Sequence, residues 1–293
     1  MEPAMGRRGE GSKTEGVRGG GGEREKGGIL REAGALGRLY VSFLTHNLKN
    51  EMIYRTNFLL NVGMDIGFMA VNVIFFAILF TNVTTIGGWT FHQTVILIGS
   101  VGLVREAAYL LFRQGFLELG DYVRTGQFDV LLVKPVRPNV HLGFRHVSLT
   151  ESLGEGVMGV ALVGYGFSHL DASWAGLPLY VALLGVSLTI YYAFCLLINS
   201  AVFWIVKSQE LNTIVYTFME TARYPRDIFR GLGKAIFTFV IPVSLIATVP
   251  ASVLAGRTDW GLIGLAVGVA AAMMTVSMAV WNLSLRHYSS ASS

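Results

Sequence analysis

Residues 57–80 read NFLLNVGMDIGFMAVNVIFFAILF, an apolar stretch in which Asp65 is the one ionisable side chain. An α-helix rises about 1.5 Å per residue, and roughly 20 apolar residues are enough to cross the hydrocarbon core of a bilayer. The stretch is long enough and apolar enough to do so. It therefore predicts a membrane-spanning helix.

Apolar runs of similar length follow along the chain, at 94–112, 147–167, 177–205, 235–255 and 260–283. The run at 235–255 differs from the others because Pro242 and Pro250 are expected to break it. We therefore expect an all-α membrane protein with six transmembrane helices, in which residues 29–288 form a single transmembrane domain.

The composition agrees with a membrane protein. Hydrophobic residues make up 52% of the 293 residues and charged residues 14%, against roughly 25% charged residues in a soluble domain. Too few charges remain for a soluble exterior, which excludes a soluble enzyme and a disordered protein. The single cysteine, Cys195, excludes a disulfide scaffold. The net charge of +4 is spread over the ends of apolar segments, so no nucleic-acid partner is expected.

Two polar stretches precede the first span. Residues 1–28 are Gly-rich and of mixed charge, which predicts a disordered tail, and whether they belong to the native protein stays open. Residues 29–55 place apolar side chains at helical spacing between polar ones. This predicts an amphipathic helix on the inner membrane surface, or alternatively a helix packed on other protein.

The distribution of Lys and Arg predicts the orientation. The connections 81–93 and 168–176 contain none, whereas 113–146 contains five and the residues before Asn57 contain ten. Cytoplasmic segments are richer in Lys and Arg, so the N-terminus and 113–146 are expected in the cytoplasm. An even number of spans returns the C-terminus to the same side of the plasma membrane.

The region 206–256 allows two topologies. Hydropathy alone makes 206–234 a cytoplasmic loop and 235–255 the fifth span. Alternatively, a more polar fifth span covers 207–224 and ends outside at Pro225, and the run containing Pro242 and Pro250 then re-enters the membrane from the outer face. Both readings give six spans.

Ionisable residues inside the expected spans lie at similar depths. Measured from the cytoplasmic ends, Asp65 is roughly 12 Å deep and Arg105 roughly 10 Å deep, which allows an ion pair between them. Glu106, Glu151 and Glu155 add three carboxylates to the same layer. This polar layer either ties the bundle together or forms a substrate portal or a proton relay.

Motifs of soluble enzymes are missing from the sequence. No phosphate-binding G-x-x-x-x-G-K-[ST] loop occurs, so ATP hydrolysis by this chain is not expected. No H-E-x-x-H or C-x-x-C pattern is present, and neither a metal site nor a catalytic residue is predicted. The G-x-x-x-G pairs at 63–67 and 264–268 permit close helix approach.

The connection RQGFLELGDYVRTGQFDVLLVKPVRPN at 113–139 is amphipathic and ends at Pro135 and Pro138. A short helix with an apolar face and charged flanks is suited to a groove on a partner protein. The alternative is an interfacial helix that rests on lipid.

Four stretches resemble one family. They are EMIYRTNFLLN at 51–61, GQFDVLLVKPVRP at 126–138, YPRDIFRGLGKAIFTFVIPVSLIATVPASVLAG at 224–256 and WNLSLRHYSSASS at 281–293. The sequence resembles the permease subunits of type 2 ATP-binding-cassette (ABC) exporters, in particular a branch of small six-span bacterial permeases.

The resemblance implies an export permease that pairs with a second permease subunit and with separate ATP-binding subunits. ATP and magnesium would bind on those partners, with no cofactor in this chain. The residues that would receive the motion of the ATP-binding subunit are Gly126, Gln127, Phe128, Asp129, Leu132, Lys134 and Pro135. The resemblance also favours the second topology, with Pro225, Pro242 and Pro250 in a re-entrant segment. The substrate, and the choice between homodimer and heterodimer, stay open.

Two other classes of function remain as alternatives. A proton-coupled secondary transporter would use Asp65, Glu151 and Glu155 as its relay. A membrane-embedded enzyme would need an acid, base or metal cluster, and the cytoplasmic loops offer none that is convincing. Co-purification with an ATPase subunit would separate the permease from both.

Overall fold

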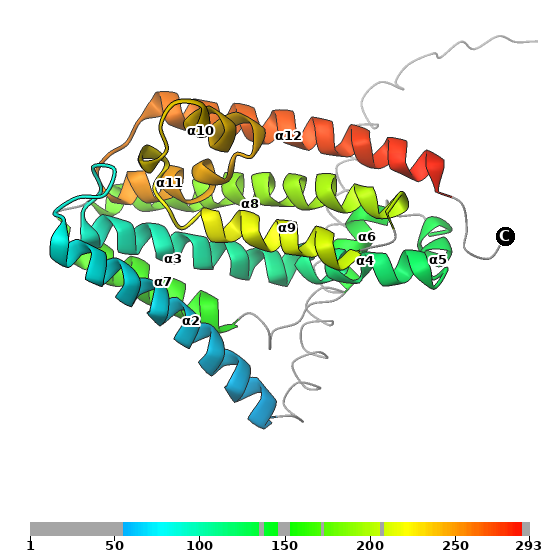
Figure 1. The fold of residues 1–293 in the computed structure, drawn as a ribbon, viewed down its shortest axis with the longest axis horizontal. Helices are drawn as coiled ribbons and strands as arrows, with labels where there is room; N and C mark the ends of the chain where they lie inside the picture. Colours follow the sequence, from blue (N-terminus) through cyan, green and yellow to red (C-terminus); the bar gives the residue numbers. More distant parts are fainter. Residues whose placement is uncertain (1–54, 135–137, 146–152, 171–172, 206–207, 289–293) are drawn as a thin grey trace, which may run out of the picture. The chain divides into compact units, whose positions relative to one another are not determined.

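A computed structural model describes residues 55–134, 138–145, 153–170, 173–205 and 208–288. The predicted tail at 1–28 and nearly all of the predicted amphipathic helix at 29–55 lie outside these residues, as do Pro135 and Glu151. Every regular element in the described ranges is helical (Figure 1), which confirms the predicted all-α class.

The described residues form longer and shorter helices. The longer helices are α2 (Arg55–Asn82), α3 (Phe91–Ala108), α4 (Gln114–Arg124), α7 (Leu153–Ser168), α8 (Leu177–Asn199), α9 (Ser208–Thr221), α11 (Val243–Leu254) and α12 (Trp260–His287). The shorter ones are α5 (Phe128–Leu132), α6 (Pro138–Arg145) and α10 (Gly231–Ala235). A π-helical turn at Tyr109–Arg113 joins α3 to α4.

Four helical stretches in the described residues are long and apolar enough to cross a membrane: Phe58–Asn82, Phe91–Arg124, Trp174–Phe203 and Trp260–His287. They coincide with four of the predicted spans, which supports a multi-pass membrane protein. A fifth is added if the bent pair in 231–254 counts as one span. Helix α7 covers the predicted span at 147–167 from Leu153 onward, and the residues before it are not described. Six spans therefore stay a prediction.

Helices α3 and α7 cross at close range because glycines face each other. A Cβ atom built on Gly99 would lie 2.8 Å from the carbonyl oxygen of Gly159, and one built on Gly159 would lie 2.9 Å from that of Gly99. Neither position accepts a side chain unless a backbone moves, so these glycines set the helix separation. The G-x-x-x-G pairs at 63–67 and 264–268 instead have nothing within 4 Å of an added Cβ.

The segment 208–227 runs antiparallel to α3 and α4. Near its start, Arg113 donates from Nη1 to Oδ1 of Asn212 over 3.0 Å. At its end, Nε1 of Trp89 donates to Oδ2 of Asp227 over 3.2 Å. The segment therefore covers the same axial distance as residues 89–113, from the end of the bundle near α4 to the connection between α2 and α3 (Figure 1).

The apolar run at 235–255 is not one straight helix. A π-helical turn at Ile236–Val240 follows α10, Pro242 lies directly before α11, and the two helical parts, 231–238 and 243–254, meet at 85°. Pro242 thus breaks the run as predicted.

Pro250 does not break the run, and that part of the prediction is wrong. It lies inside α11, where its ring nitrogen cannot donate to the carbonyl of Ile246. The hydroxyl of Ser187 on α8 donates to that carbonyl instead, over 2.7 Å. Because a neighbouring helix supplies the lost hydrogen bond, α11 continues through the proline.

Candidate functional site: a charged network beside a polar helix

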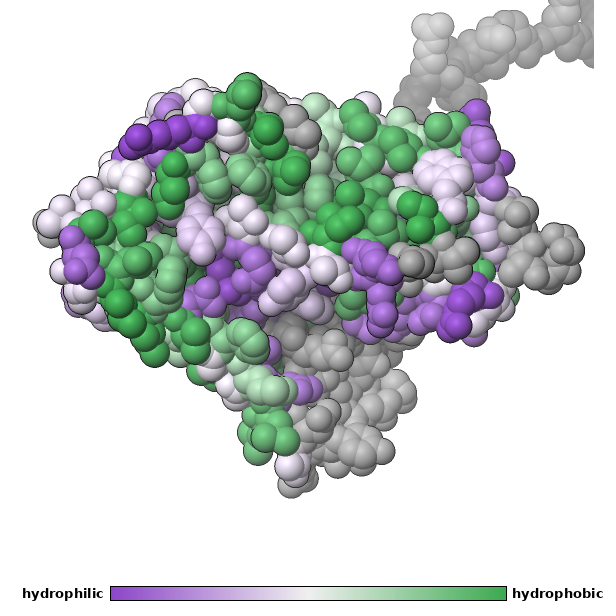
Figure 2. All heavy atoms as spheres, in the orientation of Figure 1, coloured by the Kyte–Doolittle hydropathy of each residue, from purple (hydrophilic) through white to green (hydrophobic). Residues whose placement is uncertain are grey.

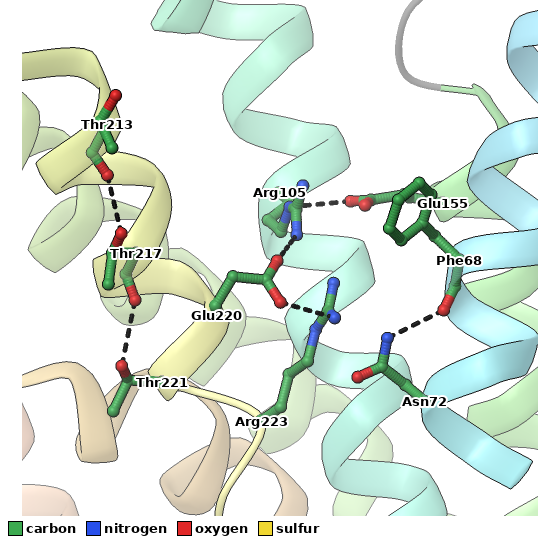
Figure 3. Close-up of polar contacts among 9 residues, drawn as sticks. All are labelled: Phe68, Asn72, Arg105, Glu155, Thr213, Thr217, Glu220, Thr221 and Arg223. Carbon is green, nitrogen blue, oxygen red and sulfur yellow. Dashed lines mark hydrogen bonds and ion pairs between the residues drawn. The ribbon is translucent and has the colours of Figure 1, made fainter. Parts of the chain in front are cut away.

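A network of four charged side chains joins α3, α7 and α9 within the bundle. Nε of Arg105 lies 2.9 Å from Oε2 of Glu155, and its Nη1 lies 2.7 Å from Oε1 of Glu220. The second carboxylate oxygen of Glu220 lies 2.7 Å from Nη1 of Arg223 (Figure 3). Arg105 therefore holds one glutamate from each of two other helices, and Glu220 bridges two arginines.

The two sides of this network differ in exposure. The side chain of Glu155 is 11% exposed, whereas that of Glu220 is 30% exposed. The guanidinium of Arg105 also lies 5.3 Å from the ring centroid of Tyr216, a cation–π contact on the α9 side. Hence the network is buried on the α7 side and partly exposed on the α9 side.

Glycines on α7 make room for two more carboxylates. A Cβ atom on Gly154 would lie 2.6 Å from Cβ of Asp65, and one on Gly156 would lie 2.7 Å from Cγ of Glu106. Both acidic side chains thus pack against the backbone on either side of Glu155. Four members of the predicted polar layer, from three helices, do gather in one place.

The pairing within the layer includes a partner that depth alone did not suggest. Arg105 makes ion pairs with Glu155 and Glu220, whereas the sequence analysis found only that depth allows a pair with Asp65. The sequence analysis placed neither Glu220 nor Arg223 in this layer. The signal was present, because a helix at 207–224 that carries these charges needs partners inside the protein.

Helix α9 carries a stripe of hydroxyl groups on its outer side. Thr213, Thr217 and Thr221 follow one another at intervals of four residues, and each donates to the carbonyl four residues earlier, over 2.9 to 3.0 Å. Thr213, Tyr216 and Thr217 are exposed. Figure 2 shows a hydrophilic patch in the middle of this side of the molecule, with hydrophobic surface next to it.

The opposite side of α9 is apolar and buried. It is formed by Leu211, Val215, Phe218, Met219 and Ala222, and the ring of Phe218 stacks on that of Phe194 of α8 at 3.8 Å. Helix α9 is therefore amphipathic within the bundle, with its polar side outward. Exposed hydroxyls fit water or another protein better than lipid tails.

The predicted coupling segment is anchored to the bundle by Phe128. This side chain is fully buried, and its ring lies 5.1 Å from that of Phe203 and 5.2 Å from that of Tyr288. Burial, and then the nearby carboxylate of Asp129, raise the pKa of Tyr288. Phe128 therefore holds α5 against the ends of α8 and α12 and is not available to a partner.

The surface that α5 leaves exposed consists of other residues. Val133 is 87% exposed and Val130 62%, and Leu132, Gln127 and Lys134 are exposed beside them. Gly126 allows the turn between α4 and α5 with a φ of 73°, a conformation that larger residues rarely adopt. The sequence analysis included Leu132 and missed both valines, because their exposure depends on how α5 rotates around Phe128.

The Pro225 segment packs on the connection between α2 and α3. Pro225 precedes the 3₁₀ turn Arg226–Ile228, and a Cβ on Gly87 would lie 3.1 Å from the backbone of Asp227. The guanidinium of Arg257 donates to the carbonyl of Gly88 over 2.9 Å. Pro225 therefore lies at the end of the bundle opposite α4, where the second topology requires it.

Within the described residues, no group of three or more His, Cys, Asp or Glu side chains could hold a metal ion. The network is thus an arrangement of ion pairs and hydroxyls. It can hold three helices together and present a polar surface beside apolar ones.

Comparison with known proteins places these features in a family. Residues 66–292 match the family described as ABC-2 family transporter protein. The chain matches none of the curated proteins and none of the solved structures with which it was compared. Membrane subunits of this family associate with an ATP-binding subunit and are typically not catalytic themselves. The chain therefore belongs to the ABC-2 transporter family, as a membrane-embedded permease subunit.

Proposed function

We propose that this permease subunit forms half of an export pathway, which it completes with a second permease subunit and which separate ATP-binding subunits drive. The observation that carries the proposal is the outer side of α9, where Thr213, Thr217 and the half-buried Glu220 lie beside apolar helices. In a bilayer such a surface requires water or a polar partner.

The proposal includes six spans, with α7 and α9 as the third and fifth. Helix α9 is shorter and more polar than an ordinary span, but its Glu220 is paired with Arg105 and its Asn212 accepts a hydrogen bond from Arg113. The 85° bend before α11 then belongs to a re-entrant segment, entered from the end that carries Pro225. With α4 and α5 cytoplasmic, both termini are cytoplasmic as well.

The exposed side of α5 is the proposed contact with the ATP-binding subunit. Val130, Leu132 and Val133 form a small apolar surface on a helix that Phe128 fixes to α8 and α12. A displacement of α5 would therefore be transmitted directly to α8 and α12. Alternating access needs two packed states with different contacts, and no reaction in this chain.

The ion pairing favours this function over a proton-coupled transporter. A relay needs carboxylates that gain and lose protons during the cycle, whereas Glu155, one of the three carboxylates of that relay, is held in an ion pair with Arg105.

The association with an ATP-binding subunit can be tested by co-purification of the two proteins. Replacing Val133→Asp should reduce the retained ATP-binding subunit by about tenfold, because a charge then enters an apolar contact. Val83→Asp is the control, since Val83 is also exposed but lies at the opposite end of the bundle. Equal retention by both variants would contradict the contact.

The polar pathway can be tested separately by thiol labelling. Cys195 is fully buried, so cysteines introduced by Thr217→Cys or Val267→Cys would be the reactive ones. A charged maleimide should label Thr217→Cys rapidly and leave Val267→Cys, on the apolar side of α12, unlabelled, because thiolates form poorly in hydrocarbon. Labelling of neither variant would argue against a water-accessible pathway along α9.

A further inference from the structure

A cavity of about 340 Å³ lies between the π-helical turn, α6, α8 and α12, away from the charged network. Leu111, Phe112, Leu188 and Met274 give it a mostly apolar wall. Its size is in the range of small-molecule sites. Helices α8 and α12 are candidate spans, so lipid is the medium expected around the mouth of the cavity.

The cavity has one polar end. Asn139, which is 3% exposed, donates from Nδ2 to the hydroxyl of Tyr192 over 3.2 Å and lies 3.4 Å from the sulfur of Met278. Since the phenolic oxygen accepts that bond, its own proton is available to another acceptor. The pair therefore offers one hydroxyl donor at this end of an otherwise apolar cavity.

The polar end lies on the cytoplasmic side of the cavity. Tyr192 is one turn closer than Leu188 to the end of α8 at Asn199, and Met278 is one turn closer than Met274 to the end of α12 at His287. Those helix ends carry Phe203 and Tyr288, which hold the coupling segment through Phe128. The apolar end therefore extends toward the middle of the membrane.

A π-helical turn and a glycine shape the wall of the cavity. The π-helical turn adds one residue per turn, a feature that often marks functional sites, and it places Leu111 and Phe112 in the wall. Gly143 of α6 faces Phe112, and an added Cβ there would lie 3.2 Å from Cβ of that residue. Met274 and Met278 have flexible side chains that fit an irregular apolar ligand.

We propose that this cavity binds one acyl chain of a membrane phospholipid from the cytoplasmic leaflet. The chain fills the apolar end beside Leu188 and Met274, and its ester carbonyl accepts a hydrogen bond from Tyr192. A phospholipid has its ester group near the membrane surface and its acyl chain toward the middle of the membrane. The cavity has the same order, with its polar end on the cytoplasmic side and its apolar wall toward the middle. The choice of the cytoplasmic leaflet rests on the topology proposed above, whereas the cavity itself does not depend on the export function.

The test uses the full chain in membranes and a phospholipid with a diazirine in the middle of one acyl chain. After illumination, we expect peptides containing Leu188 or Met274 to be labelled more strongly than α2, which exposes many apolar residues to bulk lipid. Labelling of α8 and α12 no stronger than that of α2 would overturn the proposal, whatever the behaviour of the variants.

Two variants then test the cavity and its polar end. Thr189→Trp fills the cavity and should remove the strong labelling of Met274, whereas Gly185→Trp, one turn away with open space around it, should retain it. Tyr192→Phe keeps the shape and should lower phospholipid labelling about threefold to tenfold, as expected for one hydrogen bond. Labelling by a hydrocarbon diazirine without an ester should be unchanged. Unchanged phospholipid labelling in Thr189→Trp or in Tyr192→Phe would count against the site as assigned.

Discussion

Helices α7 and α9 each bring one glutamate to Arg105, and they do so in different ways. Helix α7 approaches α3 until the backbones of Gly99 and Gly159 touch, and Glu155 is enclosed. Helix α9 packs its bulky apolar side on α8, and Glu220 stays partly exposed beside a row of threonines. Arg105 thus makes an enclosed ion pair with α7 and a partly exposed ion pair with α9.

The largest effect is expected from removing the shared arginine. Arg105→Met would leave the buried Glu155 without its cation and Glu220 with Arg223 alone, at a cost of about 3–5 kcal/mol in the free energy of unfolding. The measurement is the thermal unfolding midpoint of detergent-solubilised protein. Arg124→Met is the control, because its pair with Asp121 is exposed and worth at most about 1 kcal/mol. Similar losses in both variants would show that the buried network does not hold the helices together.

A second prediction concerns the closed side alone. Gly159→Leu would force α7 away from α3 and should cost about 1–3 kcal/mol of stability. Gly164→Leu, on the same helix but with nothing within 4 Å of an added Cβ, should stay within about 0.5 kcal/mol of the parent protein. If the two substitutions lower the unfolding midpoint equally, the glycine contact does not set the helix separation.

A third prediction separates the two glutamates. Glu155→Gln should lower stability by about 1.5–3 kcal/mol, the range for hydrogen bonds to charged groups, and Glu220→Gln by less, since solvent reaches it. Transport measured in vesicles should respond in the opposite order if α9 moves during the cycle. A greater loss of stability in Glu220→Gln than in Glu155→Gln would contradict this assignment of the more stabilising ion pair to α7.

The smallest effect on stability is expected at the threonine stripe. Thr217→Val removes a hydroxyl that bonds only to its own helix and should change the unfolding free energy by no more than about 0.5 kcal/mol. Transport should fall nonetheless if the stripe lines the pathway. Normal transport by a variant that carries valine at 213, 217 and 221 would show that these hydroxyls do not contribute.

Much of the fold follows from periodicity and length. Residues 57–80 become part of α2 because no other arrangement satisfies the backbone of so apolar a stretch in a bilayer. The break at Pro242 follows equally directly from the missing N–H. Pro250 shows the limit, since its helix continues only because Ser187, more than sixty residues earlier, donates to the carbonyl of Ile246.

The candidate site was predictable in its location and less so in its contacts. The rise per residue of an α-helix is fixed, so the depth of each residue can be calculated from the sequence. This calculation placed Asp65, Arg105, Glu106 and Glu155 in one layer. The rotation of each helix about its axis is set by packing, and this decided that Arg105 pairs with Glu155 and Glu220. Rotation likewise buried Phe128 and exposed Val133 on α5.

Hydropathy and length along the chain are enough to establish that this protein is helical, lies in a membrane and carries a charged layer inside it, because hydrocarbon admits few other structures for such segments. Which charges meet, which glycines touch and which side of α9 stays exposed become visible only in the packed bundle. These contacts join residues far apart in the chain, such as Arg105 and Glu220, and depend on helix rotation and separation, which the packing of all helices together fixes.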